Sequence, residues 1–456
     1  MKKFISILSL SSLAVMPALA AEATDSRILN IFDKAVFYDG YNSNIFDADK
    51  QDGIIRHSNY LYAKKLSEQQ LDQFGEELRF NATIGALCDN YDRFGNVNLA
   101  LVPKGAESYK PEDVERIELA RFITPFMNKN KAPYEVPYTW VDNKASLIFR
   151  DANLREKYDF YLELEVFGVP YSANTQVKGC SGRNDVFAGS FSFETSGVPA
   201  SKTYKHHLIP IVIKKPETIG HNLNNYSEAG TDTIGTCTKT YTFIAPEDMA
   251  DACIKLVMSN HGANEDGEEY VRRKHLIYFD NELTEVFSPG GKSCEPYRIY
   301  NTQRNMIYGD TPEDDWEEWS NWCPGDIIPI RELPLGALKA GEHKIMIRVP
   351  DAVFASKQGD FPVSIYVQGV TDGSLPAGIE NINYKADISM SVVGETLYLG
   401  GEEKASSLEI YDAAGTLCYG TFHPTAEVNL AMLGSGVYVA VASTADGRLN
   451  FVKFAR

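Results

Sequence analysis

The chain has 456 residues and an acidic composition, with 62 acidic and 44 basic residues. Removing residues 1–20, which hold two lysines and no acidic residue, takes the formal net charge from −18 to −20. Such a charge repels phosphate groups, which argues against nucleic acid or an anionic membrane as a partner. The length is sufficient for two to four domains.

The N-terminus predicts a secretory signal peptide over residues 1–20. Residues 2–3 are lysines, residues 4–15 are mainly apolar, and an Ala-Leu-Ala cleavage site stands at residues 18–20. The apolar run is too short to span a bilayer, and no later run is long enough. We therefore expect an exported protein without a membrane span, in a compartment that permits disulfides.

Short strands dominate the rest of the sequence. A helix is expected over residues 66–79, where Ser67 begins a run rich in Glu, Gln and Leu. The sequence shows no alternation of strands and helices, so a parallel sheet is improbable and antiparallel sandwiches are expected. The clearest strand-like runs are residues 146–150, 160–167, 207–213, 344–349 and 362–367.

Two turn-rich segments, residues 196–204 and 371–378, divide the chain. The block that follows the second one has alternating strands with glycines at the turns, which predicts a small Ig-like β-sandwich. The expected division is a signal peptide at 1–20, a first sandwich domain at 21–196, a second at 197–370, a linker at 371–377 and a last domain at 378–456.

The last block also resembles the C-terminal sorting domain of the Bacteroidetes type IX secretion system. It has Ile-Glu-Asn at 379–381, Ile-Tyr-Asp-Ala-Ala-Gly at 410–415, Leu-Gly-Ser-Gly-Val-Tyr at 433–438 and Lys-Phe at 453–454. The resemblance implies an address read at the outer membrane of a Gram-negative bacterium, often removed, with the secretion machinery as partner. A generic carbohydrate-binding sandwich is the alternative interpretation.

Cysteine spacing gives no Cys-x-x-Cys pair, so a zinc site is not expected. The odd count predicts that at least one thiol stays outside the disulfides, and Cys418, alone in the last block, is the candidate. The seven cysteines are Cys88, Cys180, Cys237, Cys253, Cys294, Cys323 and Cys418.

Three acidic residues have unusual neighbours. Asp92 lies beside an arginine and between aromatic residues, and Glu269 lies in a highly charged segment. Glu165 lies inside an apolar strand, with Glu163 on the same face. Carboxyl groups in different environments can divide the activation of water from the protonation of a leaving group. Taken singly, each acid is more simply explained as a paired or solvated residue.

In combination, five segments in order resemble the peptide-N-glycosidase F family, over about residues 28–369. The specific matches are CDNYDRFGNV at 88–97, RFITPF at 121–126 and WCPGDIIPIR at 322–331; LEVF at 164–167 and EEYVRRKHLI at 268–277 match more loosely. The resemblance implies two antiparallel jelly-roll domains side by side with the active site in the cleft between them.

It also implies a reaction. The amide between asparagine and the first N-acetylglucosamine of an N-linked glycan would be hydrolysed without cofactor or metal, leaving aspartate. The resemblance places Asp92 at the scissile linkage, with Glu165 and Glu269 orienting water and the substrate amide or first sugar. Substrate-binding roles are implied for Arg93, Phe167, His261 and Trp322.

The resemblance further implies a Cys294–Cys323 disulfide. The family partner of Cys88 is absent, and Cys180 is the expected replacement. Phe167 stands where the family has a tryptophan, so an apolar surface is kept but an indole N–H is lost. Gly267 and Val271 replace cysteines that flank the third acid, so this loop is expected to be looser.

Glycan specificity, including tolerance of core fucose, stays open at this point. Trp319 stands where the family has an arginine, in an acidic stretch, residues 313–319, that is either a solvated loop or a sugar-binding rim. N-linked glycoproteins are the expected substrates, and the protein is expected to be a monomer.

Two other classes of protein compete with the amidase. His206 and His207 suggest a copper monooxygenase, but adjacent residues of a strand point to opposite faces. A glycan-binding protein on the same scaffold, without catalysis, is the stronger alternative. No Gly-x-Ser-x-Gly elbow or phosphate-binding glycine loop is present.

Overall fold

The computed structural model describes residues 26–48, 50–197, 205–214, 222–223, 237–262, 267–303, 320–354, 359–371, 388–401, 404–413, 417–422, 424–444 and 449–456. The predicted signal peptide, the linker after residue 371, the Ile-Glu-Asn segment at 379–381 and the acidic stretch with Trp319 lie outside these residues.

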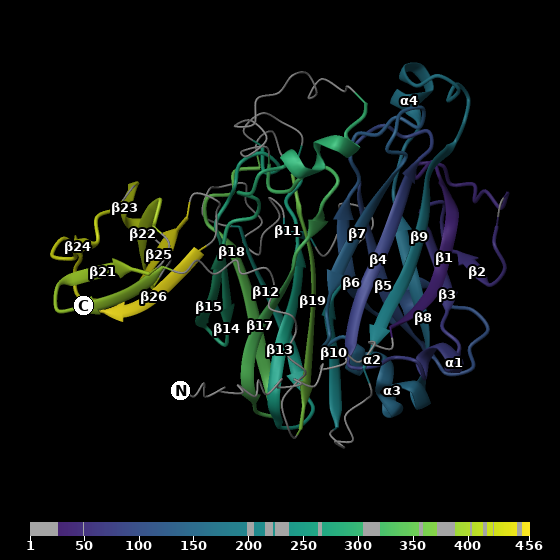
Figure 1. The fold of residues 1–456 in the computed structure, drawn as a ribbon. Helices are drawn as coiled ribbons and strands as arrows, with labels where there is room; N and C mark the ends of the chain where they lie inside the picture. Colours follow the sequence, from purple (N-terminus) through teal and green to yellow (C-terminus); the bar gives the residue numbers. More distant parts are fainter. Residues whose placement is uncertain are drawn as a thin grey trace, which may run out of the picture.

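Two antiparallel sheets face each other in the first half of the chain (Figure 1). Leucine and phenylalanine side chains from both sheets, such as Phe80, Leu99 and Phe193, fill the space between them. One sheet has the order β1 (Arg27–Tyr38), β9 (Asp185–Ser196), β4 (Glu77–Ala86), β7 (Glu135–Val141). The other has the order β16 (Ile327–Ile328), β6 (Glu115–Ile123), β5 (Phe94–Pro103), β8 (Tyr158–Val166), β3 (Leu61–Lys65), β2 (Ile54–Arg56).

A second pair of sheets lies beside the first (Figure 1), around a core that includes Ile254, Ile347 and Val363. One sheet has the order β10 (His206–Val212), β19 (Phe361–Val370), β13 (Met249–Met258), β17 (Ile330–Leu338), and β11 (Asn222–Leu223) also pairs with β19. The other has the order β12 (Cys237–Ala245), β18 (Gly341–Val349), β14 (His275–Phe279), β15 (Glu282–Phe287). The expected class, two antiparallel jelly-roll domains side by side, is confirmed.

A third, smaller sandwich follows at the C-terminal end, as predicted. Its sheets are β20 (Ser389–Val393), β21 (Thr396–Gly400), β24 (Glu427–Asn429) and β23 (Leu417–Phe422), β22 (Ser407–Asp412), β25 (Val437–Ser443), β26 (Leu449–Ala455). Tyr411, Val439 and Val441 point out of this sandwich into the core of the second jelly roll. The exact domain limits given above stay predictions.

Helices are short, and two of the sequence-based expectations are corrected here. The helix expected over 66–79 is only α1 (Glu68–Leu71), although Ser67 caps it together with Gln70. The alternating residues from Glu77 onward form β4 instead, because their apolar side chains face the core. The other helices are α3 (Ala152–Lys157), α4 (Tyr171–Gln176), η1 (Pro111–Asp113) and η2 (Glu295–Tyr300).

Residues 146–150, predicted as a strand, form helix α2 (Ser146–Arg150). A short apolar run does not distinguish a strand from a buried helical turn. Here Ile148 and Phe149 pack into the first core, whereas Leu147 packs against Cys253 and Val370 of the second jelly roll. The other strand-like runs are confirmed as β8, β10, β18 and β19.

The two jelly rolls are joined by more than their covalent connection. Strand β16 follows Trp322 in sequence but pairs with β6 of the first jelly roll. Lys255 of β13 is buried and bonds Asp142 of the first jelly roll at 2.9 Å and Glu332 at 2.7 Å. The side chain of Trp322 also belongs to the first core. The junction is therefore part of the packed interior.

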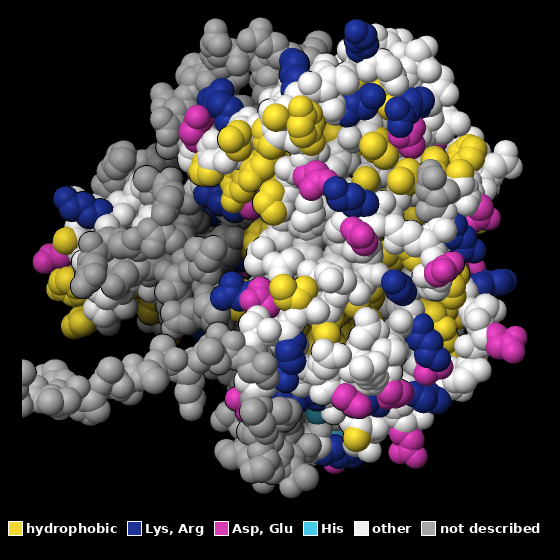
Figure 2. Space-filling view, turned by 45° about the vertical axis from the view of Figure 1, so that its right-hand side comes forward, with side chains coloured by type: hydrophobic (Ala, Val, Ile, Leu, Met, Phe, Trp, Pro, Cys, Tyr) yellow, Lys and Arg dark blue, Asp and Glu magenta, His cyan; other side chains and the backbone are white. Residues whose placement is uncertain are grey.

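The surface shown in Figure 2 carries intermingled acidic and basic side chains, without a continuous basic patch over its described residues. Among the described residues, no helix has both the length and the apolar character needed to cross a membrane.

Candidate active site

The outer face of the β6–β5–β8 sheet, turned away from the first core, is lined with polar side chains. Asn96 pairs in register with Glu165, and Asn98 with Glu163, while Leu162 and Leu164 point inward. Glu163 is neutralised by Arg116, whose Nε lies 2.9 Å from Oε2. The strand alternation therefore delivers Glu165 to this face, as the two-residue spacing predicted.

A bulge in β6 adds a second ion pair to the same face. The register between β5 and β6 shifts between Val97 and Asn98. Residues three apart in a regular strand point to opposite faces, but a bulge re-aims one of them. Glu118 and Arg121 consequently meet, with Nε–Oε1 at 2.7 Å and Nη2–Oε2 at 2.8 Å. Both side chains are fully buried.

Arg121 extends this network across the domain junction. Its Nη1 donates to Ser259 Oγ and to the carbonyl of Pro362, each at 2.8 Å. Ser259 Oγ in turn lies 2.8 Å from Nε2 of His261. Burial, followed by the charges of Arg121 and Lys214, lowers the pKa of His261 to about 3, so the imidazole is neutral. Its ring lies 5.0 Å from that of Phe94 and 5.9 Å from that of Trp322.

Asp92 lies in the loop just before β5, and two hydrogen bonds to Thr124 hold the backbone of the residue that follows it. Arg93 N donates to Thr124 Oγ1 at 2.7 Å, and Thr124 N donates to the carbonyl of Arg93 at 2.6 Å. The Arg93 side chain points to Asp89, with Nε–Oδ2 at 2.8 Å. The guanidinium next to Asp92 is thus already paired with another carboxylate.

Glu269 lies in a turn of the second jelly roll that is bonded at several points. Its Oε2 accepts from Gly262 N at 3.0 Å, and its carbonyl accepts from Ser320 Oγ at 2.9 Å. The neighbouring Glu268 is buried and bonds the N–H groups of Val353 and Phe354 at 2.7 and 2.8 Å. These bonds constrain the turn although the family cysteines are missing at its ends.

Asp92 and Glu269 come together across the junction. Burial, followed by the charge of Glu269, raises the pKa of Asp92 to about 8, and the charge of Arg93 opposes this shift. Burial also raises the pKa of Glu269, against hydrogen bonds from Gly262 and Tyr270. The two carboxyl groups therefore retain a proton at a pH where isolated carboxyl groups have lost theirs.

Glu165 has a different environment. It is 2% exposed, and its Oε1 lies 2.8 Å from Nζ of Lys214, which is also 2% exposed. The ammonium group of Lys214 lies 4.8 Å from the ring centroid of Phe94. Burial lowers the pKa of Lys214, and Glu165 and Glu118 oppose this. Within the described residues, no hydrogen bond or ion pair connects Glu165 with Asp92 or Glu269.

The remaining predicted substrate-binding residues, Phe167 and Trp322, differ in their exposure. Phe167 follows β8 and is half-buried, with its ring 5.3 Å from those of Tyr41 and Tyr60. Trp322 is only 5% exposed, and its Nε1 donates to the carbonyl of Asn260 at 3.0 Å. The buried Trp322 therefore packs beside His261, whereas Phe167 and Arg93 keep accessible surface.

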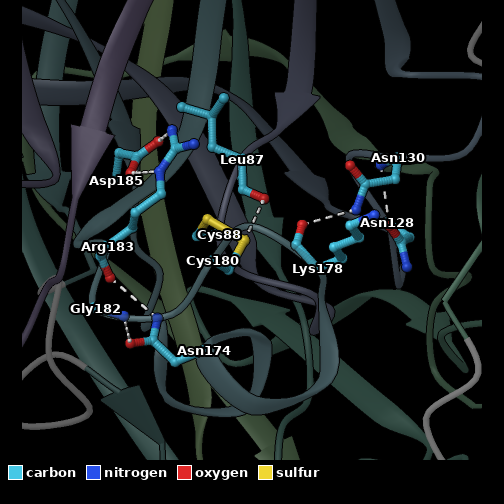
Figure 3. The surroundings of a disulfide bond; sticks show 10 residues. All are labelled: Leu87, Cys88, Asn128, Asn130, Asn174, Lys178, Cys180, Gly182, Arg183 and Asp185. Carbon is cyan, nitrogen blue, oxygen red and sulfur yellow. Dashed lines mark hydrogen bonds and ion pairs between the residues drawn. A yellow bond between two sulfur atoms is a disulfide. The ribbon is translucent and has the colours of Figure 1, made fainter.

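Two disulfides fasten the loops around the site. The structure contains the Cys294–Cys323 bond that the resemblance implies, and also the Cys88–Cys180 bond. Figure 3 shows the second bond beside Asn174 of α4, whose side chain bonds Gly182 and Arg183. Cys237 and Cys253 are buried thiols, and Cys418 lies outside both bridges. Such bridges fit an oxidising compartment.

Sequence reasoning missed several members of the site. Lys214 follows an ordinary apolar strand, so nothing in its local pattern indicates a partner for Glu165. Arg121 belongs to a motif that the resemblance identified, but its partner Glu118 depends on the bulge. Tyr270, which interacts with both Asp92 and Glu269, has no pattern of its own.

The histidine pair has a structural explanation. His206 Nδ1 lies 3.1 Å from Asp151 Oδ2, an acid that also caps α3. Over the residues described, no group of three or more His, Cys, Asp or Glu residues is arranged to hold a metal ion.

Comparisons with known proteins bear on the two jelly rolls. The family model "Peptide-N-glycosidase F, N terminal" matches residues 28–181, and "Peptide-N-glycosidase F, C terminal" matches residues 230–368. A search of curated proteins found no match.

Solved structures give a similar result. PNGF-II is 18% identical with a TM-score of 0.55, over 75% of this chain and 65% of PNGF-II, so the chain spans less than two thirds of that protein. PNGase F from Flavobacterium meningosepticum, described as a glycosylasparaginase, is 15% identical with a TM-score of 0.46, over 78% of this chain and 99% of that one. At 18% identity the likeness to PNGF-II concerns the fold alone. The two family models together cover well over half of the residues, and the chain belongs to the peptide-N-glycosidase F family.

Proposed function

We propose that the protein is an exported amidase that hydrolyses the bond between an asparagine side chain and the first N-acetylglucosamine of an N-linked glycan. Water would add to the amide carbon and the C–N bond would break. The peptide would keep an aspartate, and the glycan would leave as a glycosylamine that decays to sugar and ammonia. No cofactor or metal takes part in this proposal.

The observation that best supports this proposal is the interaction of Asp92 with Glu269. Two half-buried carboxyl groups that interact electrostatically and hold a proton near neutral pH would supply an acid and a base in one place. The ionised member would take a proton from water, and the protonated member would give one to the departing nitrogen. Asp92 is assigned to the linkage itself, and Glu269 to the water and the amide.

The other residues receive supporting roles. Glu165, held by Lys214, would orient water or accept a hydrogen bond from the first sugar. Arg93 and Phe167 would contact the sugar from the first jelly roll. His261 is neutral and would offer a hydrogen bond without a charge. Trp322 would fix His261 in place, because its own side chain is buried.

The route to the outside is also part of the proposal. Residues 1–20 would be the signal peptide, and residues 378–456 would be the type IX sorting domain, with residues 371–377 as linker. The disulfides and the third sandwich are compatible with this route. The jelly rolls would extend over 21–196 and 197–370, and the protein would act as a monomer on N-linked glycoproteins outside a Bacteroidetes-type cell.

The test is incubation of the purified protein with a denatured N-glycoprotein, followed by mass spectrometry of its peptides. We expect a gain of aspartate at glycosylated asparagines with release of the intact glycan. Asp92→Asn should abolish this gain, whereas Asp113→Asn, an exposed acid of η1, should preserve it. Cleavage between the first two sugars would show that the bond was assigned wrongly.

One observation favours a glycan-binding protein without catalysis. Glu165 is already neutralised by a buried lysine, which suits a binding surface as well as a catalytic one. Glycopeptides that stay intact but bind the protein, across high-mannose, complex and core-fucosylated types, would establish this second function.

A further inference from the structure

An exposed group of aromatic side chains adjoins the candidate active site. The ring of Tyr41 meets Phe167 edge-on at 5.3 Å and stacks with Tyr171 at 6.3 Å, with only 19° between the planes. Tyr60 meets Phe167 from another side at 5.3 Å. Tyr41 is 70% exposed and Tyr171 is 60% exposed, whereas Phe167 is half-buried. We call Tyr41, Tyr60, Phe167 and Tyr171 the aromatic platform.

The platform is connected to Asp92 through Arg93. Tyr41 is among the groups that act electrostatically on the guanidinium of Arg93, which directly follows Asp92 in sequence. The same guanidinium lies 5.2 Å from the ring centroid of Tyr91. A ligand whose reacting bond is at Asp92 can therefore extend over Arg93 onto Tyr41 and Tyr171.

Hydrogen bonds and a close backbone contact hold the loop that carries Tyr41. Gly40 N donates to the carbonyl of Gly168 at 2.8 Å, and any side chain at Gly40 would overlap the ring of Phe167. The buried amide of Asn59 donates to the carbonyls of Asp39, Asn42 and Asn44, at 2.9–3.1 Å. The chain thus brings Tyr41 against Phe167 by close backbone contact.

The segment that carries Tyr171 is fastened as firmly. Val169 N donates at 2.8 Å to Asp89, the acid that also holds Arg93. The Cys88–Cys180 disulfide joins the strand end before Asp92 to the loop after α4 (Figure 3). Because both halves of the platform are fixed before a ligand arrives, binding costs little ordering of side chains.

Two exposed, stacked tyrosines need a functional explanation. Exposed apolar side chains that are grouped together, rather than scattered singly, often mark a binding surface. Tyrosine combines a flat apolar face with a hydroxyl at its edge, which matches a pyranose ring with its C–H face and surrounding hydroxyl groups. The platform rings carry no formal charge, so they suit a neutral ligand.

The part of the substrate that is the same in every case indicates which ligand the aromatic platform binds. This step rests on the proposed amidase function, in which the peptide sequence differs from one substrate to the next but the inner sugars of the glycan are the same. The aromatic platform, whose rings are held in place, is suited to these inner sugars rather than to a variable peptide. We propose that Tyr41 and Tyr171 form a sugar-stacking subsite for N-glycan residues beyond the first N-acetylglucosamine.

The experiment compares two substrates with one peptide, one carrying a full N-glycan and one trimmed to a single N-acetylglucosamine. For Tyr41→Ala/Tyr171→Ala we expect kcat/KM to fall about five- to tenfold on the full glycan and less than about twofold on the trimmed one. Tyr41→Phe/Tyr171→Phe should keep most of the activity, because the flat faces remain. Tyr398→Ala, an exposed tyrosine of β21, is the matched control and should change neither value.

Equal losses on both substrates, or no loss on either, would overturn the subsite. A loss that follows the peptide when two peptides carry the same glycan would assign the platform to the peptide instead. If the unmodified protein cleaves neither substrate, the amidase proposal fails. The platform is then judged by calorimetric binding of the two glycopeptides, where the double alanine variant must lose affinity for the full glycan alone.

Discussion

The candidate site contains two groups of acids, one buried and one half-buried, and they differ in their partners. Glu118, Glu163 and Glu165 each bond a basic side chain, respectively Arg121, Arg116 and Lys214. Asp92 and Glu269 instead interact with each other electrostatically, and the guanidinium of Arg93 next to Asp92 points to Asp89. The raised pKa values of Asp92 and Glu269 let this second group retain a proton near neutral pH.

The difference shows how one interface can serve two purposes. A buried carboxylate with a bonded cation is fixed in its charged state and gives structure, not proton transfer. A buried carboxyl group beside another acid is poised to exchange its proton, at a cost in stability. We therefore expect substitutions in the two groups to have opposite consequences for activity and for folding.

The largest expected effect is on activity. Asp92→Asn should lower kcat/KM by about a thousandfold or more, since positioned acid–base groups contribute about 10²–10⁴-fold. Glu165→Gln should cost about ten- to a hundredfold, because it removes one hydrogen-bonding charge and no transferable proton. The rates are measured as glycan release from one glycopeptide. A larger loss in Glu165→Gln than in Asp92→Asn would reverse the assignment of roles.

The second prediction concerns stability. Arg121→Met leaves Glu118 buried without its cation and should reduce the free energy of unfolding by about 4 kcal/mol. Adding Glu118→Gln removes the uncompensated charge and should recover at least half of the loss. Denaturant unfolding of the single and double variants measures both values. A double variant as unstable as the single one would mean that packing, rather than charge, explains the loss.

The third prediction separates folding from function at Glu165. Lys214→Met should destabilise the protein by about 3 kcal/mol, again through a buried charge without a partner. Lys214→Met/Glu165→Gln should regain stability but not activity. Thermal unfolding and glycan release are compared on the same samples. Recovery of both properties together would show that Glu165 has only a structural role.

The smallest expected effect is a pH dependence. Asp92 binds its proton more tightly in the folded chain, with a pKa of about 8, than at its ordinary value of 3.8. Folding therefore takes up a proton between these values, and stability falls as the pH rises from about 4 to about 8. Asp92→Asn cannot titrate, so its stability advantage over the unmodified protein should grow over this range by at least about 1 kcal/mol. Unfolding midpoints at pH 4 and pH 8 test the sign, and an advantage that shrinks with pH would contradict it.

Much of the fold followed from the sequence because strand patterns are local. The alternation in residues 160–167 predicted β8 and the shared face of Glu163 and Glu165 correctly. The helix at Ser146–Arg150 was missed, because its apolar residues face two cores at once and show no strand or helix period.

The site was less accessible to sequence reasoning. The meeting of Asp92 with Glu269 joins residues from two domains, and only the family resemblance suggested it. Lys214 approaches Glu165 through the packing of one domain on the other, and the Glu118–Arg121 pair depends on a bulge. Neither the Lys214–Glu165 pair nor the Glu118–Arg121 pair produces a periodic pattern in the sequence.

Strand β16 has a consequence for the order in which the molecule is assembled. The sheet that carries Glu165 ends with Ile327 and Ile328, two residues that leave the ribosome, or cross a membrane, long after the other strands of that sheet. Until they arrive, the edge of β6 at Arg121 and Phe122 lacks its hydrogen-bonding neighbour. This edge of the candidate site can thus be completed only after residue 328 has been made, and a chain interrupted before that residue cannot assemble it.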